Sequence, residues 1–348
     1  MACLKDSLVL IFVFFVAPNM TSRVDGESQV PCYFIFGDSL SDAGNNNALL
    51  TLAKANYPPY GVDFYFGPTG RFTNGLTMVD IIALLVGLNQ PIPPFANIAT
   101  DIEEGVNYAS GGAGIRDETG SYFGDHISLT EQLANHRDII SRLTRIIGDE
   151  AATQTYLNKC LYTVDMGSND YIFNYFLPES GTRKLFTPDQ FAAQLINQYS
   201  QQIRSLYDAG ARKIALFGVG RLGCIPFVLA SNGITQEIIT RAVQLFNGRL
   251  VSLVDELNKD LANSKFIYIN LTSIQSGFKV LKAGCCPVNN NGLCIPYSMP
   301  CPNRDEYTIL DCIHPTQATN HVIAATSYNA SHPSDAYPFD ISHLVQQY

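Results

Sequence analysis

The segment YFIFGDSLSDAGNN, residues 33–46, joins a short apolar run to a turn, and it guides the interpretation of the whole chain. Tyr33–Phe36 has the unbroken apolar character of a strand buried on both faces. Gly37 and Asp38 favour a turn directly after it, so Ser39 is expected at the carboxyl end of that strand. A serine there exposes both its hydroxyl and its own backbone N–H, the groups that a nucleophilic serine uses. Gly-Asp-Ser is also ordinary turn chemistry, so the segment alone does not establish a site.

The rest of the chain alternates short apolar runs with helix-like segments. Further runs of strand length are Gly105–Ala109, Leu161–Met166, Lys213–Phe217 and Lys265–Ile269. Apolar residues recur at helical spacing in Leu76–Leu88, Leu129–Ile147, Pro188–Ala209, Thr235–Leu261 and Gln317–Tyr328. This alternation predicts an α/β fold with a mainly parallel five-stranded sheet and helices on both faces. In such sheets, sites form just beyond the carboxyl ends of the strands, where Ser39 is expected.

The amino-terminal segment, residues 1–27, has the organisation of a secretion signal. A lysine precedes the apolar run Leu8–Ala17, which is shorter than the roughly 20 residues that a membrane-spanning helix needs. We expect cleavage between Ser22 and Ser28, leaving a single domain over residues 28–348. A retained membrane anchor is the alternative interpretation.

The composition and charge disfavour one class of function. Of the 348 residues, 46% are hydrophobic, enough to bury a sizeable core, and the formal net charge is -9. Lysine and arginine form no cluster, and nucleic acid binding needs cations that neutralise phosphates. We therefore expect no nucleic acid partner, whereas the oligomeric state stays open.

Cysteine usage agrees with export, because disulfides persist outside the cytosol. Of nine cysteines, eight remain once Cys3 leaves with the leader. Residues 277–307 form a loop insertion rich in Pro, Gly and Asn, and five cysteines crowd in or beside it: Cys285, Cys286, Cys294, Cys301 and Cys312. We expect disulfides and leave their pairing open; a zinc cluster is the alternative, but no Cys-x-x-Cys pair exists.

Two sequons follow the leader. Asn270 stands in Asn-Leu-Thr and Asn329 in Asn-Ala-Ser. Both are expected to accept glycans if they are exposed.

Two more segments at predicted strand ends suit a catalytic site. Residues 107–114, Asn-Tyr-Ala-Ser-Gly-Gly-Ala-Gly, contain three glycines, which let the backbone approach a ligand and direct an N–H toward it. Asn169, in Gly-Ser-Asn-Asp, has an amide suited to a developing oxyanion. The alternatives are a plain flexible loop for the first segment and a helix cap for the second.

Asp311 and His314, in Asp-Cys-Ile-His-Pro, have the spacing of an acid and the base that it orients. If this stretch turns helically, the carboxylate reaches the Nδ1–H of the imidazole and leaves Nε2 as the base. The alternative is that Asp311 caps the terminal helix and His314 lies on its surface. The remaining histidines are expected to lack such an acid and to serve as surface or packing residues: His126, His136, His321, His332 and His343.

These pieces are more informative together than apart. Ser39, the glycine segment and Asn169 each follow a predicted strand. With Asp311 and His314 they supply a nucleophile, a base, an orienting acid and oxyanion donors, which is the full set for acyl transfer.

Two other motifs fit less well. Gly218-Val-Gly-Arg-Leu-Gly223 has the spacing of a dinucleotide-binding loop. Pro226 blocks a helix start there, and the required acid about 20 residues further on is missing, so a packed turn is favoured. The lipase elbow Gly-x-Ser-x-Gly is not formed, because residue 41 is a serine.

The motifs resemble those of the plant GDSL esterase/lipases, a branch of the SGNH hydrolases. The letters of the second name fall on Ser39 in Gly-Asp-Ser-Leu, Gly112 in Ala-Ser-Gly-Gly-Ala-Gly, Asn169 in Gly-Ser-Asn-Asp and His314 in Asp-x-x-His-Pro. The resemblance extends over essentially the whole mature chain. Pro287, Leu310 and Cys312 depart from the usual pattern, outside the catalytic positions.

The resemblance implies a flavodoxin-like, three-layer α/β/α sandwich with a catalytic triad of Ser39, Asp311 and His314. It also implies an oxyanion hole formed by the N–H groups of Ser39 and Gly112 and the side chain of Asn169. The expected protein is a secreted serine esterase or lipase of the apoplast or cell wall. It would act on small-molecule, lipid or cell-wall esters through an acyl-enzyme, with no metal and no organic cofactor.

Three questions stay open on sequence alone. An acyltransferase would use the same acyl-enzyme with an alcohol acceptor, and a non-catalytic binding or defence protein could share the fold. The third concerns a set of aromatic residues that either line an acyl pocket or belong to the core: Phe64, Tyr65, Phe72, Phe173, Tyr175 and Phe176.

Overall fold

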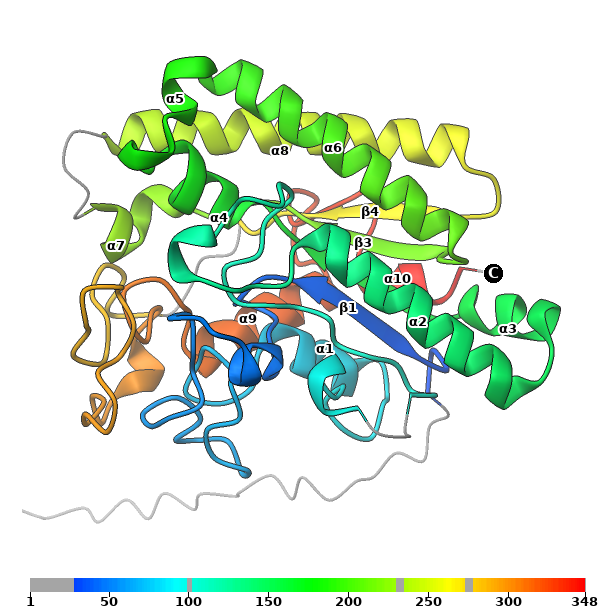
Figure 1. The fold of residues 1–348 in the computed structure, drawn as a ribbon, viewed down its shortest axis with the longest axis horizontal. Coiled ribbons are helices and arrows are strands. Elements are labelled where there is room, and N and C mark those ends of the chain that lie inside the picture. The colour runs from blue at the N-terminus through cyan, green and yellow to red at the C-terminus, as the bar shows by residue number, and fades with distance from the viewer. Residues whose placement is uncertain (1–27, 99–101, 230–234, 273–277, 348) are drawn as a thin grey trace, which may run out of the picture.

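A five-stranded sheet forms the centre of the protein in the computed structural model, which describes residues 28–98, 102–229, 235–272 and 278–347. The strands, adjacent in numerical order, are β1 (Tyr33–Gly37), β2 (Leu161–Asp165), β3 (Lys213–Phe217), β4 (Lys265–Ile269) and β5 (Ala336–Tyr337) (Figure 1). β1 to β4 are parallel and β5 pairs antiparallel with β4. The mainly parallel five-stranded sheet is therefore confirmed. The expected leader, residues 1–27, lies outside the described residues.

Each face of the sheet has its own hydrophobic core, because side chains alternate along a strand. In β1, Phe34 and Phe36 join one core and Tyr33 and Ile35 join the other. The first core is covered by α2 (Leu129–Ile147), α6 (Pro188–Asp208) and α8 (Gln236–Asp260). The second is covered by α1 (Met78–Leu85), α9 (Gln317–Tyr328) and α10 (Ile341–Val345). Figure 1 shows α6 and α8 on one side of the sheet and α1 and α9 on the other, which gives a three-layer α/β/α sandwich.

The helix boundaries follow local capping chemistry. α6 begins where the Thr187 hydroxyl accepts the Gln190 N–H and the Gln190 side chain accepts the Thr187 N–H, a capping box with Pro188 in the first turn. The remaining short helices are α3 (Glu150–Leu157), α4 (Ser168–Asp170), α5 (Thr182–Leu185) and α7 (Pro226–Leu229). One-turn segments lie at η1 (Asn45–Ala48), η2 (Phe95–Asn97), η3 (Ser121–Phe123), η4 (Tyr171–Tyr175), η5 (Pro178–Ser180), η6 (Leu222–Cys224) and η7 (Arg304–Glu306).

The expectation of a strand over Gly105–Ala109 is wrong, and β5 completes the sheet instead. The segment does run beside β1, with a single parallel bridge between Ile35 and Asn107. Its outer side is occupied, because the Asn45 side-chain amide donates to the carbonyls of Asn107 and Ala109 at 2.9 and 2.7 Å. Four backbone hydrogen bonds still join residues 104–110 to β1, but only Ile35 and Asn107 complete a bridge, because the Gly37 N–H donates to the Gln132 side chain instead. β5, with two residues, is too short to leave a periodic signal in the sequence.

Disulfides are confirmed for six cysteines. Cys32–Cys160 joins the residues preceding β1 and β2, and Cys285–Cys301 and Cys286–Cys294 close the loop insertion. Cys224 and Cys312 carry free thiols, so the expected bridging does not extend to Cys312.

Candidate active site

Ser39 stands on a tight turn directly after β1. Gln132 of α2 accepts the Gly37 N–H at 3.0 Å and donates to the Gly37 carbonyl at 2.9 Å, so the strand's hydrogen bonding ends there. The Asp38 carboxylate accepts the Leu40 N–H at 2.9 Å, a side-chain turn that reverses the chain. The serine is thereby placed at the carboxyl edge of the sheet, 8% exposed.

The structure brings Ser39, His314 and Asp311 into one hydrogen-bonded chain. His314 Nε2 lies 2.8 Å from Ser39 Oγ, and His314 Nδ1 lies 2.7 Å from Asp311 Oδ2. A carboxylate only accepts, so Nδ1 carries the proton and Nε2 is free to accept the serine proton. Ser39 and His314 are 275 residues apart in sequence.

The loop that carries the acid and the base is fixed by the acid itself. Asp311 Oδ1 accepts the N–H groups of Ile313 and His314, both at 2.7 Å. Burial alone would raise the pKa of Asp311, but the neighbouring His314 and its hydrogen bonds outweigh burial and lower that pKa. The carboxylate therefore stays ionised beside the imidazole.

One expectation about the other histidines is wrong. His343 Nδ1 lies 2.7 Å from Asp340 Oδ1, the same spacing of three residues as in Asp311 and His314. The His343 side chain is 63% exposed, however, whereas that of His314 is 4% exposed. An Asp–His pair of this spacing therefore does not by itself indicate a triad, and the buried contact with Ser39 is what distinguishes His314.

Two aromatic residues that support the triad were not found from the sequence. The fully buried Tyr60 donates its hydroxyl to Asp311 Oδ2 at 2.6 Å. The Phe72 ring packs on the His314 imidazole, with ring centroids 4.8 Å apart. The expected alternatives for Phe72 were core or acyl pocket; it belongs to the core and packs there against the base. No local pattern signals such roles, because the Tyr60 contact spans 251 residues.

The three expected oxyanion donors are the Asn169 side chain and the N–H groups of Gly112 and Ser39, and they differ in their position relative to the cavity at the sheet edge. Asn169 follows β2 in α4, and its Nδ2 donates to the Ala113 carbonyl at 2.9 Å, beside Gly112. Gly112 has φ +88°, a left-handed conformation that favours glycine. Ser39 and Asn169 both line the cavity at the sheet edge, whereas Gly112 does not.

The glycine segment is held by residues that follow the serine. The Asp42 carboxylate accepts the Gly111 N–H at 3.0 Å, and the Asn46 side chain donates to the Gly111 carbonyl at 2.9 Å. Asn107 in turn donates to the Ser41 carbonyl at 2.7 Å. The side chains of Asp42 and Asn46, together with that of Asn107, thus fix the position of the glycine segment, a role that no local motif indicates.

Buried carboxyl groups surround the serine turn. Burial, and then repulsion by Asp165, raises the pKa of Asp38. Burial also raises the pKa of Asp165 to about 7, and that of Asp42 to about 6 despite three backbone hydrogen bonds. The site is therefore a poorly solvated environment, in which dipoles and charges act strongly.

A cavity of about 560 Å³ opens at Ser39 and Asn169. Ten of the 22 residues that line it are aliphatic: Leu40, Ile172, Leu222, Ile225, Leu271, Leu281, Ile309, Ile313, Val322 and Ile323. The charged side chains along it are Asp38, Arg221 and Lys282. Its volume and apolar walls suit a small organic molecule or an acyl chain.

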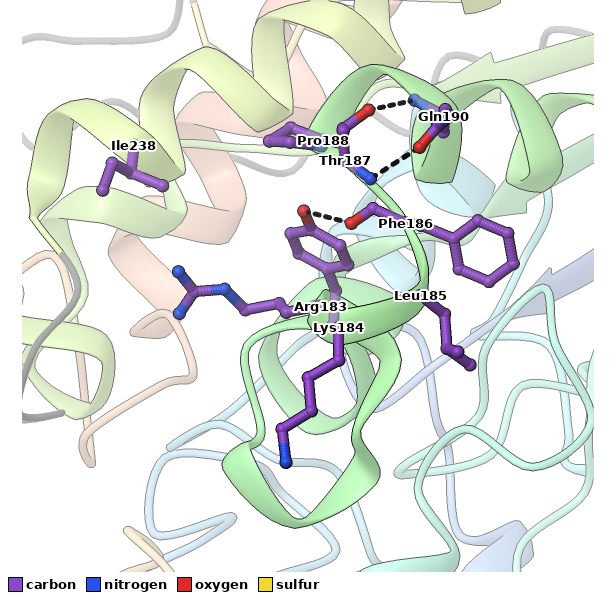
Figure 2. A pocket seen from close by; sticks show the side chains of 9 residues that line it. Arg183, Lys184, Leu185, Phe186, Thr187, Pro188, Gln190 and Ile238 are labelled. Carbon is purple, nitrogen blue, oxygen red and sulfur yellow. Dashed lines mark hydrogen bonds between the residues drawn. The ribbon is translucent and has the colours of Figure 1, made fainter.

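The six aromatic residues considered for an acyl pocket do not line this cavity. Five are buried in the core and Tyr65 is 70% exposed. Tyr175 instead borders a second pocket of about 310 Å³ between the starts of α6 and α8, with Arg183, Phe186 and Ile238 (Figure 2). That pocket contains no member of the triad.

The remaining sequence motifs have simpler positions. Gly218–Gly223 forms a packed turn after β3: a Cβ on Gly218 would lie 2.6 Å from the Tyr268 hydroxyl. Asn329 is exposed, whereas the Asn270 amide donates to the Ser334 carbonyl at 2.8 Å.

Among the described residues, no cluster of three or more His, Cys, Asp or Glu side chains suits a metal ion. In the same part of the chain, no helix combines the length and apolarity needed to span a membrane.

Comparisons with known proteins agree over most of the chain. A family model described as GDSL-like Lipase/Acylhydrolase matches residues 33–326. The chain is 48% identical over 356 residues to GDSL esterase/lipase At4g18970 of Arabidopsis thaliana, covering 97% of this chain and 98% of that protein. It is 47% identical over 342 residues to GDSL esterase/lipase At1g29670 of the same plant, covering 93% of this chain and 94% of the relative.

Proposed function

The chain belongs to the GDSL-like lipase/acylhydrolase family, and from this premise we propose that it is a carboxylic ester hydrolase with Ser39 as nucleophile, His314 as base and Asp311 as orienting acid. One observation carries the assignment of roles: a buried imidazole lies 2.8 Å from the Ser39 hydroxyl and 2.7 Å from a carboxylate. The similarity in sequence shows the family, and this geometry supports the proposed roles of the three residues.

The reaction proceeds through an acyl-enzyme. His314 Nε2 takes the proton of Ser39, and Ser39 Oγ attacks the ester carbonyl. The imidazolium that forms is stabilised by Asp311 and returns the proton to the departing alcohol. A water molecule, activated by the same imidazole, then attacks the acyl-enzyme, releases the carboxylic acid and restores Ser39.

The tetrahedral intermediates carry a negative oxygen that needs donors. Asn169 and Ser39 line the cavity, and we assign this role to the Asn169 side-chain amide and the backbone N–H of Ser39, together with the N–H of Gly112. Nucleophile, base and oxyanion donors are all supplied by the chain, so this mechanism requires no metal or organic cofactor.

The substrate is an ester with an apolar acyl chain. This follows from the aliphatic walls of the 560 Å³ cavity, since burying a chain there removes apolar surface from water. Export to the apoplast or cell wall is supported by the amino-terminal sequence and by three disulfides, which are typical of oxidising compartments. Asn329 is the better placed of the two proposed glycan acceptors because it is exposed.

The decisive experiment is to replace Ser39. Ser39→Ala removes the nucleophile, so hydrolysis of p-nitrophenyl butyrate should fall to background while the thermal unfolding temperature stays close to that of the wild type. A fluorophosphonate probe should label the wild type at Ser39 and leave the variant unlabelled. Retained turnover in the purified variant would overturn the proposal. Failure of the wild type to react with the probe would favour the non-catalytic alternative.

A further inference from the structure

The triad acid has a fourth hydrogen-bond donor that comes from a distant loop. The Tyr60 hydroxyl donates to Asp311 Oδ2, the same oxygen that accepts the proton of His314 Nδ1. The Tyr60 oxygen in turn accepts the backbone N–H of Cys294 at 3.1 Å. Tyr60 and Asp311 are both fully buried, so neither bond competes with water.

Cys294 belongs to a loop that also encloses Asp311. The Leu310 carbonyl accepts the N–H groups of Cys285 and Cys286, at 2.7 and 3.0 Å. On the other side, the Cys312 N–H donates to the Gly292 carbonyl at 3.0 Å. Backbone bonds from one loop therefore hold the residues directly before and after the triad acid.

The same loop fixes the segment that carries the tyrosine. The Tyr57 hydroxyl donates to the Cys294 carbonyl at 3.1 Å, and the Tyr297 N–H donates to the Pro58 carbonyl at 2.8 Å. The disulfide Cys286–Cys294 joins the part of the loop that holds Leu310 to the part that holds Tyr60. Both supports of Asp311 are thereby linked covalently.

We propose that Tyr60 is a positioning residue for the triad, and that the disulfide Cys286–Cys294 sets the rate of ester hydrolysis by holding Tyr60 against Asp311. This rests on the proposed function of the same site. The hydroxyl restricts the carboxylate to the orientation that faces His314. It also shares the negative charge, and so contributes to the lowered pKa of Asp311.

The test is a double-mutant cycle on the purified protein, in which Tyr60 and the disulfide are changed separately and together. Tyr60→Phe keeps the ring and removes the hydroxyl. A hydrogen bond to a charged group is typically worth enough to change a rate by roughly 10-fold or more. We expect kcat for p-nitrophenyl butyrate to fall by about that factor with KM nearly unchanged. Removing a donor concentrates charge on Asp311, which stabilises the imidazolium, so the acidic limb of the kcat/KM profile should move to higher pH.

The loop is tested by Cys286→Ser with Cys294→Ser, alone and combined with Tyr60→Phe. If the disulfide acts through Tyr60, the cysteine variant lowers kcat in the wild-type background and adds little in the Tyr60→Phe background. Tyr162→Phe is the matched control, because it removes another buried tyrosine hydroxyl, bonded to the Leu157 carbonyl, that has no contact with the triad. Its kcat should equal that of the wild type.

Specific outcomes would overturn the inference. One is an unchanged kcat and pH profile in folded Tyr60→Phe. Another is a cysteine variant that lowers kcat by the same factor in the Tyr60→Phe background as in the wild-type background. If Tyr60→Phe does not fold, the cysteine variant still decides: a normal kcat overturns the role of the disulfide. Fluorophosphonate labelling of wild-type Ser39 is independent of Tyr60, so it separates these outcomes from a failure of the proposed function.

Discussion

The amide of Asn169 connects three segments that are far apart in the chain. Nδ2 donates to the Ala113 carbonyl and lies 3.4 Å from Asp38 Oδ2. Burial, followed by repulsion from Asp165, raises the pKa of Asp38, so this side chain tends to keep its proton. A neutral carboxyl group accepts more weakly than a charged oxygen. The second N–H of Asn169 can therefore turn to an oxyanion when one forms at Ser39.

Replacing Asn169 tests this donor. In Asn169→Ala the oxyanion loses one preorganised N–H, and kcat should fall by about 10²–10³. Asn174→Ala is the control, because Asn174 is also buried after β2 but bonds Thr119 and Thr182 rather than the site. Steady-state kinetics on a p-nitrophenyl ester measure both. Loss of less than about threefold in Asn169→Ala would remove Asn169 from the oxyanion hole.

The residues that carry local chemistry were the ones that the sequence could suggest. Ser39, Asp311 and His314 stand in short motifs whose turn chemistry and spacing have a physical meaning of their own. Tyr60 stands in no such motif, because its role comes from a contact with a residue 251 positions away. The same holds for Asp42 and Asn46. Their spacing after the serine suggests a polar turn, but it does not indicate their hydrogen bonds to the Gly111 backbone.

At the scale of elements, the carboxyl end of β2 carries an unusual group. Asp165 is the last residue of the strand and pairs in register with Gly37 of β1. It is 2% exposed, and its Oδ2 has no hydrogen-bond partner among the described residues. Burial raises its pKa to about 7. Ionising the Asp165 carboxyl group in the folded state should therefore lower the free energy of unfolding.

We expect the protein to lose stability as the pH rises from 6 to 7. The unfolded chain releases the Asp165 proton near pH 4, whereas the folded chain keeps it until about pH 7. The unfolded state then binds fewer protons, and the free energy of unfolding falls by up to roughly 1.4 kcal/mol per pH unit. Asp38, whose pKa is also raised by burial, adds to this loss, whereas His136, whose pKa burial lowers to about 3, opposes it. The pKa values of Asp42 and Asp170 are raised to about 6, so their contributions lie mostly below this window.

Urea unfolding at pH 6 and pH 7 checks this expectation. Asp165→Asn cannot ionise and no longer repels Asp38, so its free energy of unfolding should change less across the window than that of the wild type. Asp208→Asn, at the exposed end of α6, should keep the wild-type dependence. Equal slopes in wild type and Asp165→Asn would show that Asp165 does not hold its proton in the folded state.

The long helices and the four parallel strands were predictable, whereas the two edges of the sheet were not. The helix predicted at Pro188–Ala209 is α6, which ends one residue earlier, at Asp208. Its position was predictable because the capping box and Gly210 are local signals. Gly105–Ala109 reads as a strand, yet the Asn45 side chain takes its outer carbonyls. β5 pairs through two residues, and its existence depends on where the chain returns after α9. Both differences arise from tertiary contacts that local sequence does not encode.

At the scale of the whole molecule, the cavity at Ser39 is assembled from segments spread over most of the chain. Leu40 follows β1, Ile172 follows α4, Leu222 follows β3 and Val322 lies on α9. Parallel strands place all their carboxyl ends at one edge, and this brings such distant side chains together. Each segment contributes one or two apolar side chains, so acyl-chain selectivity belongs to the assembled fold and not to any motif.

The length of the acyl chain should therefore control turnover. From p-nitrophenyl acetate to octanoate, kcat/KM should rise by up to about fourfold per methylene, the factor that corresponds to roughly 0.8 kcal/mol for each buried CH₂ group. Val322→Phe narrows the cavity and should lower kcat/KM for octanoate while leaving acetate nearly unchanged. Ile238→Phe is the matched control, since Ile238 lines the second pocket, near α6, which contains no triad residue (Figure 2). A flat dependence on chain length, or an equal loss with octanoate in both variants, would show that the acyl chain binds outside the cavity at Ser39.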